Sequence, residues 1–437
     1  MDITQEMINT TTDLMQFLDD SPTAAHAVLT MKKLLINNDF REISEKDEWD
    51  LKPGDKFFTI RNSTALIAGI IGNSPIIDTG FHVIGAHTDS PGFRIKSNSV
   101  YEKEGYIQLG VEIYGGPILA TWTDRDLTLA GKIIIHHNHG IETRLWRSNK
   151  NLVRLPNVAI HMDREVNDSG LKLDFEKHLP PVIGMAGSQP FTKENLKQLI
   201  ASDLQVTADQ IVEFELEIID PQKASFLGIS NEFFASGRID NLMMCHAALS
   251  ALTSIEKAPD VTMVVSLFDA EEIGSATMNG GGSPFLGQIL ERLMLTQDYS
   301  REDFLRAIAK SFVLSADGAH AVHPNYVDKY KAKHLCRLNQ GLVIKLNAKQ
   351  RYASGPETTA QIELLAHKAE IPTQKYIHRT DKPCGSTIGP ITATNYGITT
   401  ADIGLPMVSM HSIREMAGSA DQYFMVRFMK EFITSDL

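Results

Sequence analysis

Apolar runs of strand length alternate with helical segments in the second half of this chain, and this alternation restricts its fold more than any other feature. Strands are predicted at 261–268, 312–314 and 342–346, and helices at 241–255 and 421–433. Strands that alternate with helices form a mostly parallel sheet, and helices cover both of its faces. The sequence therefore predicts an α/β fold.

The first half of the chain contains two segments that differ in residue composition and hydrophobic pattern. Residues 1–92 follow the same pattern as the second half, with a helix predicted to start at Ser21-Pro22 and a buried strand at 81–86. Residues 93–232 are instead rich in glycine, β-branched residues and turns, which is typical of β structure. We therefore predict a main domain made of residues 1–92 plus 233–437, interrupted by a β-rich insertion at 93–232.

Charge and composition exclude several classes of protein. The formal net charge is -12, which disfavours nucleic acid as a partner. The cysteines Cys245, Cys336 and Cys384 are widely spaced, so neither a disulfide framework nor a cysteine zinc knuckle is expected. The start of the chain is acidic where a secretory signal is basic, and the apolar run 65–71 is too short to cross a bilayer. We expect a cytoplasmic protein that does not bind membranes.

Side chains that bind metal ions follow several predicted strands, and ligands of parallel α/β sheets collect beyond the carboxyl ends of strands. Taken alone, each of these side chains has an ordinary explanation as a helix cap, a turn residue, a hydrogen-bonded histidine or a solvated acid. Together they would gather so much negative charge at one edge of a sheet that divalent cations are needed to compensate it. The candidates after strands are His87, Glu271, Glu272, Asp317 and His411, and a further candidate, Asp240, lies at the start of a predicted helix.

Two neighbouring positions sharpen this hypothesis. Asp89 lies two residues after His87, within reach to accept the second imidazole N–H and fix the ring as a metal ligand. Glu271 and Glu272 are adjacent, so their side chains point in different directions. One of them is able to bind metal while the other acts as a general base on water.

Five segments of the chain resemble the aspartyl aminopeptidase family, and the resemblance extends over nearly the whole sequence. The order His, Asp, Glu-Glu, Asp, His is shared by a wider set of two-zinc exopeptidases, whereas Ser-Ala-Asp-Gly-Ala-His-Ala and His-Ser-Ile-Arg-Glu are specific to this family. The segments are Gly85–Gly92, Ser236–Asn241, Asp269–Gly274, Ser315–Tyr326 and His411–Glu415.

The resemblance implies a metallopeptidase that hydrolyses unblocked N-terminal residues of peptides, preferentially Asp or Glu. Two divalent cations are implied, with zinc expected and manganese or cobalt as alternatives. His87 and Asp317 would hold one cation, Glu272 and His411 the other, and Asp240 both. Glu271 would activate a metal-bridging water and then return the proton to the leaving amine.

The resemblance also implies a homo-oligomer, a dodecamer built from dimers, in which the insertion serves dimerisation. A histidine of a neighbouring subunit would reach the active site, and the matching residue is His161. The plain alternative for His161 is a histidine that ends an edge strand. Lys345 would bind the acidic side chain of the substrate, although pairing with an internal acid is an equal alternative. Gly385 and Ser386 would line the substrate cleft.

Three alternatives remain open at this point. The same two-metal scaffold suits an aminopeptidase for neutral residues or a deacylase, and an inactive oligomeric binding protein is a further possibility.

The cluster His136, His137 and His139 looks like a metal site, but Gly140 predicts a solvated hairpin turn there. The chain has no His-Glu-x-x-His, which excludes a zinc protease of the helix-borne type.

Overall fold

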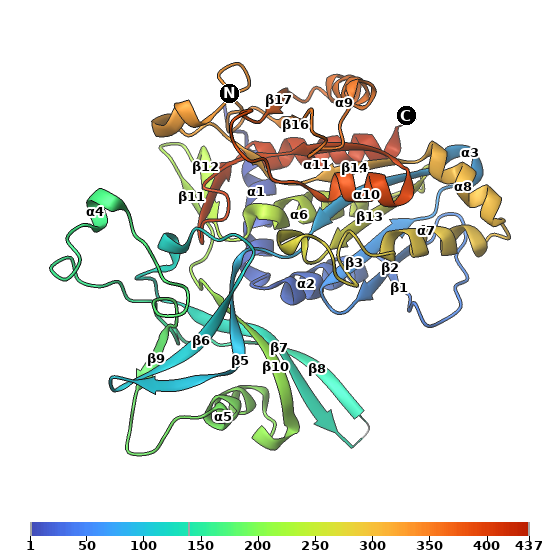
Figure 1. Ribbon diagram of the computed structural model, residues 1–437. Helices are drawn as coiled ribbons and strands as arrows, with labels where there is room; N and C mark the ends of the chain where they lie inside the picture. Colours follow the sequence, from blue (N-terminus) through green and yellow to red (C-terminus); the bar gives the residue numbers. More distant parts are fainter. Residues whose placement is uncertain (1, 139, 436–437) are drawn as a thin grey trace. The chain divides into compact units, whose positions relative to one another are not determined.

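The chain forms two compact units in the computed structural model, which describes residues 2–138 and 140–435 (Figure 1). The first unit comprises Met1–Asp89, Ala224–Met410 and Glu415–Leu437, and the second comprises Ser90–Lys223 and His411–Arg414. The predicted insertion, 93–232, begins three residues later and ends nine residues later than Ser90–Lys223, and the predicted main domain, 1–92 plus 233–437, includes His411–Arg414, which belong to the second unit. Residues 1 and 436–437 of the predicted main domain lie outside the described residues.

The first unit is built on a nine-stranded sheet. Its four central strands are parallel to one another, and three antiparallel pairs lie toward its two sides. In spatial order the strands are β1 (Arg41–Glu42), β2 (Lys56–Arg61), β3 (Ala65–Ile70), β13 (Thr262–Phe268), β4 (Phe81–His87), β14 (Phe312–Ala316), β18 (Thr399–Gly404), β16 (Leu342–Leu346) and β17 (Thr373–Ile377).

Helices cover both faces of this sheet, and each face has its own apolar core. One core includes α1 (Gln5–Asp20), α2 (Ala24–Asn37), α6 (Ile239–Thr253), α9 (Pro356–Lys368) and α11 (Asp421–Thr434). The other includes α3 (Ile76–Thr79), α7 (Phe285–Leu295), α8 (Arg301–Lys310) and α10 (Ile388–Tyr396). The predicted α/β fold with helices on both faces is confirmed.

The alternation of side chains along β4 explains why its sequence is mostly apolar, with His82 and His87 as the buried polar residues. Phe81 and Val83 enter one core, whereas Ile84 and Ala86 enter the other. Successive residues of a strand point to opposite faces, so a strand that is buried on both faces carries apolar residues on both of them.

The predicted start of the second helix is wrong. The N-cap of α2 is Thr23, whose side chain accepts a hydrogen bond from the His26 N–H. Ser21 instead ends α1, and its own N–H donates to the Leu18 carbonyl at 3.2 Å. Because only a short link joins the two helices, the hydroxyl residue nearer to α2 serves as its cap.

The first turn of α11 carries a buried acid. The Asp421 carboxylate accepts hydrogen bonds from the backbone N–H groups of Asn339, at 2.7 Å, and Gly341, at 2.8 Å. Burial nevertheless raises the pKa of Asp421 to about 7. A carboxyl group in this position ties the loop before β16 to the end of the chain.

A smaller five-stranded sheet also belongs to the first unit. Its strands in order are β11 (Ser225–Leu227), β12 (Phe233–Ser236), β20 (Glu415–Gly418), β19 (Pro406–Val408) and β15 (Ala319–His320). The strand before His411 is thus part of this small sheet and not of the nine-stranded one. The expectation that all candidate ligands follow strands of one sheet is therefore wrong for His411.

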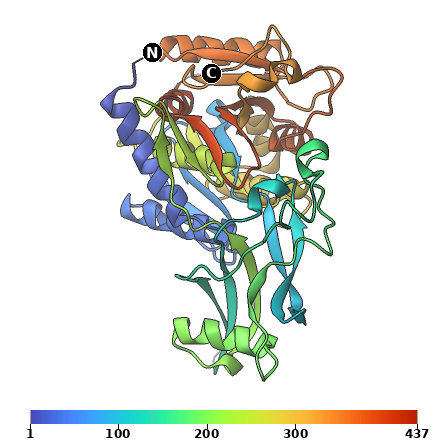
Figure 2. The same cartoon turned by 90° about the vertical axis from the view of Figure 1, so that its left-hand side faces the viewer.

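The second unit contains a six-stranded antiparallel sheet (Figure 2). The helix α5 (Lys193–Leu204) packs on it and shares its apolar core. The strands in order are β8 (Gly140–Arg147), β7 (Thr128–His137), β10 (Ile211–Ile219), β5 (Gly92–Lys103), β6 (Tyr106–Tyr114) and β9 (Val182–Met185). The β-rich character expected for the insertion is confirmed, and its role in dimerisation stays a prediction.

In the described part of the chain, no helix is both long enough and apolar enough to cross a membrane.

Candidate metal centre

Three neighbouring parallel strands deliver candidate ligands to one edge of the large sheet. β13, β4 and β14 are adjacent and parallel, so their carboxyl ends meet there. His87 is the last residue of β4, and Asp317 follows β14 directly. Glu271 and Glu272 follow β13 in a short 3-10 turn, Glu271–Ile273.

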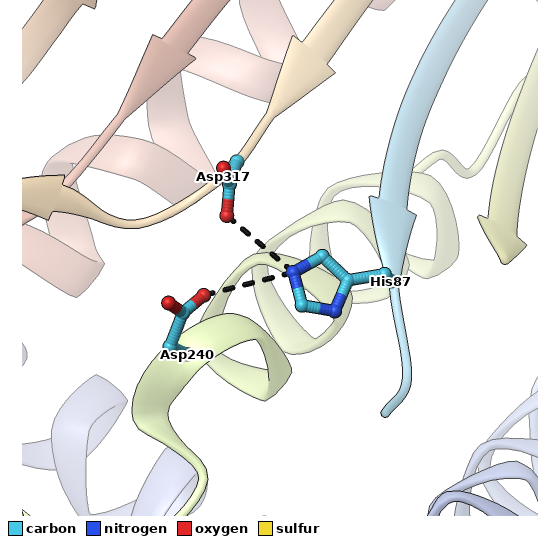
Figure 3. Close-up of side chains that lie close together, drawn as sticks. All are labelled: His87, Asp240 and Asp317. Carbon is cyan, nitrogen blue, oxygen red and sulfur yellow. Dashed lines mark ion pairs between the residues drawn. The ribbon is translucent and has the colours of Figure 1, made fainter. Parts of the chain in front are cut away.

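Asp240 reaches the same place from the start of α6. Its backbone N–H donates to Glu415 Oε2 at 3.0 Å. The next residue, Asn241, donates from its side chain to the Ala316 carbonyl at 2.9 Å, which fixes the start of α6 beside the end of β14. Figure 3 shows the Asp240 and Asp317 carboxylates pointing toward the His87 ring.

The distances within this group suit a bound cation. His87 Nε2 lies 3.5 Å from Asp317 Oδ1, 3.7 Å from Asp240 Oδ1 and 3.9 Å from Glu271 Oε2. These separations are too long for good hydrogen bonds. Ligands bound tetrahedrally at about 2.0–2.2 Å would stand roughly 3.3–3.6 Å apart, which is close to the shorter distances.

The chemistry of the donors points the same way. Single ligand atoms of His87, Asp240 and Asp317 lie within 4.8 Å of one another, and so do those of His87, Glu271 and Glu272. Imidazole nitrogen and carboxylate oxygen are the ligands that zinc takes at catalytic sites. The residues present therefore fit a divalent cation.

Asp89 fixes the orientation of the His87 ring. His87 Nδ1 lies 3.1 Å from the Asp89 carbonyl oxygen and 3.3 Å from Asp89 Oδ1. Both neighbours are acceptors, so Nδ1 carries a proton and Nε2 is the nitrogen that faces the carboxylate cluster.

Asp89 also holds the two glutamates, a function that the sequence did not reveal. Its Oδ1 accepts a hydrogen bond from the Glu271 N–H and its Oδ2 accepts one from the Glu272 N–H, both at 3.1 Å. One buried carboxylate thus positions the histidine ligand and the backbone of the Glu-Glu pair together. The only signal in the sequence was the closeness of Asp89 to His87.

Burial and mutual repulsion perturb the ionisable groups of the cluster. Burial raises the pKa of Glu271 to about 8, and the nearby acids Asp317 and Glu272 add to this shift. Burial also acts to raise the pKa of Asp317, but Lys345 and His87 outweigh it and hold that pKa below its usual range. Burial acts to lower the pKa of His87, whereas Asp317 and Asp89 raise it well above the ordinary value. Crowded carboxylates of this kind are stabilised by a cation.

Lys345 lies at the rim of the cluster, in β16. Its side chain is buried, with 2% of the residue exposed, and its Nζ donates to Asp317 Oδ2 at 3.2 Å. The ring of Tyr352 lies 5.5 Å from the same nitrogen. The structure therefore shows the alternative in which Lys345 pairs with an internal acid. Asp317 directs one oxygen to His87 and the other to Lys345.

Gly385 and Ser386 occupy an exposed loop that is anchored at both ends. Before them, Cys384 Sγ donates to the Tyr352 hydroxyl at 3.4 Å. After them, the Thr387 hydroxyl donates to Asp402 Oδ1 at 2.6 Å. Ser386 itself donates to the Arg351 carbonyl at 3.3 Å. The loop that is predicted to line the cleft is therefore held next to the residue that contacts Lys345.

Asp402 is a buried acid that the sequence reasoning missed. It is fully buried in β18 and accepts hydrogen bonds from the Ser315 hydroxyl at 2.6 Å, from Thr387, and from the Ala353 N–H at 2.5 Å. It thereby connects the strand before Asp317 with two loops around the candidate site. An aspartate inside an apolar strand was the available signal.

Two predicted site residues lie in the second unit. His411 belongs to its segment His411–Arg414, where Nδ1 donates to the Gly116 carbonyl at 3.0 Å, an arrangement that leaves the Nε2 lone pair suited to a metal. His161 is exposed in a turn and does not end an edge strand, contrary to the plain alternative. The predicted roles of both residues stay predictions.

His137, near the predicted hairpin turn, and His320, in the small sheet, contact residues outside the candidate metal centre. His137 lies next to the β7–β8 hairpin turn, where its Nε2 contacts Glu142 Oε2 at 2.7 Å, and His136 is exposed. His139 lies outside the described residues. His320 packs edge-on against the Tyr376 ring, with the ring centroids 5.7 Å apart.

Comparison with known proteins places this chain among peptidases. The family model of the aminopeptidase I zinc metalloproteases (M18) matches residues 17–433. A protein of Clostridium novyi (strain NT) named “Probable M18 family aminopeptidase 2” is 41% identical over 425 residues, which cover 96% of this chain and 97% of that protein.

Solved structures agree with the sequence comparison. A chain of the Ape4 and Nbr1 complex matches with a TM-score of 0.94 and 36% identity, covering 99% of this chain and 88% of that one. The mApe1 dodecamer of S. cerevesiae matches with a TM-score of 0.85 and 29% identity, covering 97% of this chain and 96% of that one.

Proposed function

The chain belongs to the M18 family of zinc metalloproteases and is an aminopeptidase, and on this premise we propose that it releases N-terminal aspartate or glutamate from peptides. The observation that carries this preference is the buried ammonium of Lys345 beside the carboxylate and histidine cluster. Lysine has three N–H donors, and Asp317 accepts from Nζ on one side only. A substrate carboxylate next to Nζ would gain a charge-assisted hydrogen bond.

We propose that the site holds two divalent cations, with zinc expected. His87 and Asp317 would hold one, Glu272 and His411 the second, and Asp240 both. The first set rests on the close approach of His87, Asp240 and Asp317 in the first unit. When bound, such cations act as Lewis acids that acidify a water molecule and polarise the scissile carbonyl group.

Glu271 is the proposed general base. Its carboxylate takes a proton from the attacking water and returns it to the leaving amine. Its backbone is fixed by Asp89, and its Oε2 lies 3.9 Å from His87 Nε2, so it faces the same space as the candidate ligands. Asp89 acts as a positioning residue for His87 and Glu271 together.

We further propose a homo-oligomer, a dodecamer built from dimers, in which His161 of one subunit completes the site of another. The exposed turn that carries His161 is consistent with a contact to a neighbouring subunit. The similarity to the mApe1 dodecamer supports the oligomeric state.

One observation favours a second candidate, an aminopeptidase for neutral N-terminal residues. The ion pair between Lys345 and Asp317 already compensates the charge of the lysine. If this pair persists when substrate binds, the acidic side chain gains little from Lys345.

A paired release assay distinguishes the two candidates. Chromogenic substrates with N-terminal Asp and Leu are compared for the wild type, Lys345→Met and the control Lys375→Met, in which the altered lysine pairs with Glu363 at the surface. We expect faster Asp release, its loss on chelation and recovery with zinc, and a reduced Asp-to-Leu ratio only for Lys345→Met. An equal loss with both substrates would remove Lys345 from recognition and favour the neutral-residue enzyme.

A further inference from the structure

Two adjoining cavities in the first unit are lined by basic side chains. The first has a volume of about 280 Å³ and is lined by Lys349, Arg351, Arg379 and Lys382 among others. The second has a volume of about 530 Å³, shares Arg379 with the first, and adds Lys331 and Lys333. We call these six side chains the cationic groove.

Basic side chains outnumber acidic ones around the groove, where Asp328 and Asp381 lie near Arg379, although the chain carries a net charge of -12. Among the described residues that line the first cavity, none is acidic, and Asp381 is the acid of the second. Asp381 forms a two-pronged ion pair with Arg379, at 2.8 and 2.7 Å, and so compensates that guanidinium. The other five basic side chains form no ion pair with a described residue, so the groove keeps a positive local charge.

A series of side-chain contacts links the groove to the candidate metal centre. Lys349 and Arg351 follow β16, the strand that carries Lys345. Cys384 lines the first cavity and donates to the hydroxyl of Tyr352, whose ring lies 5.5 Å from Lys345 Nζ. Lys345 in turn pairs with the candidate ligand Asp317. Cys384, at the wall of the groove, is thus separated from the candidate ligand Asp317 by two side chains, Tyr352 and Lys345.

We propose that the cationic groove binds acidic residues of the peptide substrate that follow the N-terminal residue. This inference rests on the proposed function and extends it from one residue to a preference for acidic peptides. Lysine and arginine suit carboxylates, and arginine is able to bind both oxygens at once. Because the basic side chains are mostly exposed, they act mainly by attracting the substrate, and the effect weakens with added salt.

The first test compares two peptides on the zinc-loaded full chain, Asp-Ala-Ala-Ala-Ala and Asp-Ala-Glu-Glu-Ala. We expect kcat/KM to be about tenfold higher for the acidic peptide at low salt, with the ratio approaching one at high salt. A variant with Lys349→Ser, Arg351→Ser and Lys382→Ser should lose this ratio and keep the rate on the neutral peptide. A matched control changes three exposed lysines elsewhere, Lys33, Lys46 and Lys430, to serine. Equal ratios in wild type and groove variant would overturn the proposal.

A second test does not depend on cleavage. Binding of an N-acetylated, fluorescent Glu-rich peptide is followed by anisotropy, since its blocked terminus prevents hydrolysis by an aminopeptidase. Binding that weakens at least fivefold in the groove variant alone would support the groove even if Asp peptides are not cleaved, in which case only the proposed function fails. Unchanged binding in the groove variant would overturn the groove. Inorganic phosphate and an unlabelled acidic peptide are then compared as competitors of the fluorescent peptide. If phosphate displaces it at lower concentrations than the acidic peptide does, the groove is assigned to phosphate and the peptide proposal is overturned.

Discussion

Replacement of Asp89 by asparagine tests the construction of the metal centre most directly, because one carboxylate supports both His87 and the Glu-Glu turn. In the wild type, its two oxygens accept the N–H groups of Glu271 and Glu272, both at 3.1 Å, and Oδ1 lies 3.3 Å from His87 Nδ1. Asparagine keeps the shape but places an NH₂ group against one of these N–H donors. The Asp89 backbone carbonyl, 3.1 Å from His87 Nδ1, is unaffected.

The expected magnitude follows from these contacts. A hydrogen bond to a charged group contributes about 1.5–3 kcal/mol. Asp89→Asn loses one such bond, and the bonds that remain are weaker because their acceptor no longer carries a charge. Since about 1.4 kcal/mol corresponds to a factor of ten, metal affinity should fall roughly 10- to 100-fold. The residual carbonyl contact should preserve the ring orientation, so activity should partly return at saturating zinc.

The assay is a zinc titration of the metal-free protein against a competing chelator, followed by kcat/KM measurements at saturating zinc. Asp78→Asn, at an exposed position in α3, serves as the control and should not change the affinity. A zinc affinity of Asp89→Asn within about twofold of the wild type would refute the assigned positioning role of Asp89.

Three further predictions concern Glu271, Thr387 and Asp421. Glu271→Gln should bind zinc normally and lower kcat by about 100- to 10,000-fold, since only proton transfer is removed; near-normal turnover would exclude Glu271 as the base. Thr387→Val loses a 2.6 Å hydrogen bond to Asp402 and should lower the free energy of unfolding by about 1.5–3 kcal/mol. Thr387→Ser keeps the hydroxyl, loses only a methyl group and should lower the free energy of unfolding by about 1 kcal/mol. Equal losses for the two variants in urea unfolding would contradict this prediction. Burial raises the pKa of Asp421 to about 7 in the folded protein, above its unfolded value of 3.8. The contribution of Asp421 to the free energy of unfolding is therefore complete below about pH 4 and falls by up to about 4 kcal/mol as the pH rises to about 7. Asp421→Asn should flatten this pH dependence of the unfolding midpoint, and identical slopes for both proteins would count against the buried acid.

The sequence alone predicted the strands β4, β13, β14 and β16 of the large sheet and the candidate ligands that follow the first three of them. β4, β13 and β14 are mostly apolar because both faces of the sheet are covered, so their positions are encoded locally. Since these strands are parallel, the polar residues that follow them had to meet at one edge.

Only the tertiary structure decided the partners of the polar groups. Lys345 pairs with Asp317, and Asp402 collects donors from distant segments, including Ser315, 87 positions away. The strand before His411 joins a different sheet, although its apolar sequence resembles the others. The physical reason is that apolar burial is satisfied by any core of sufficient size, whereas a buried hydrogen bond or ion pair requires one particular partner at about 3 Å, and the fold alone brings that partner near.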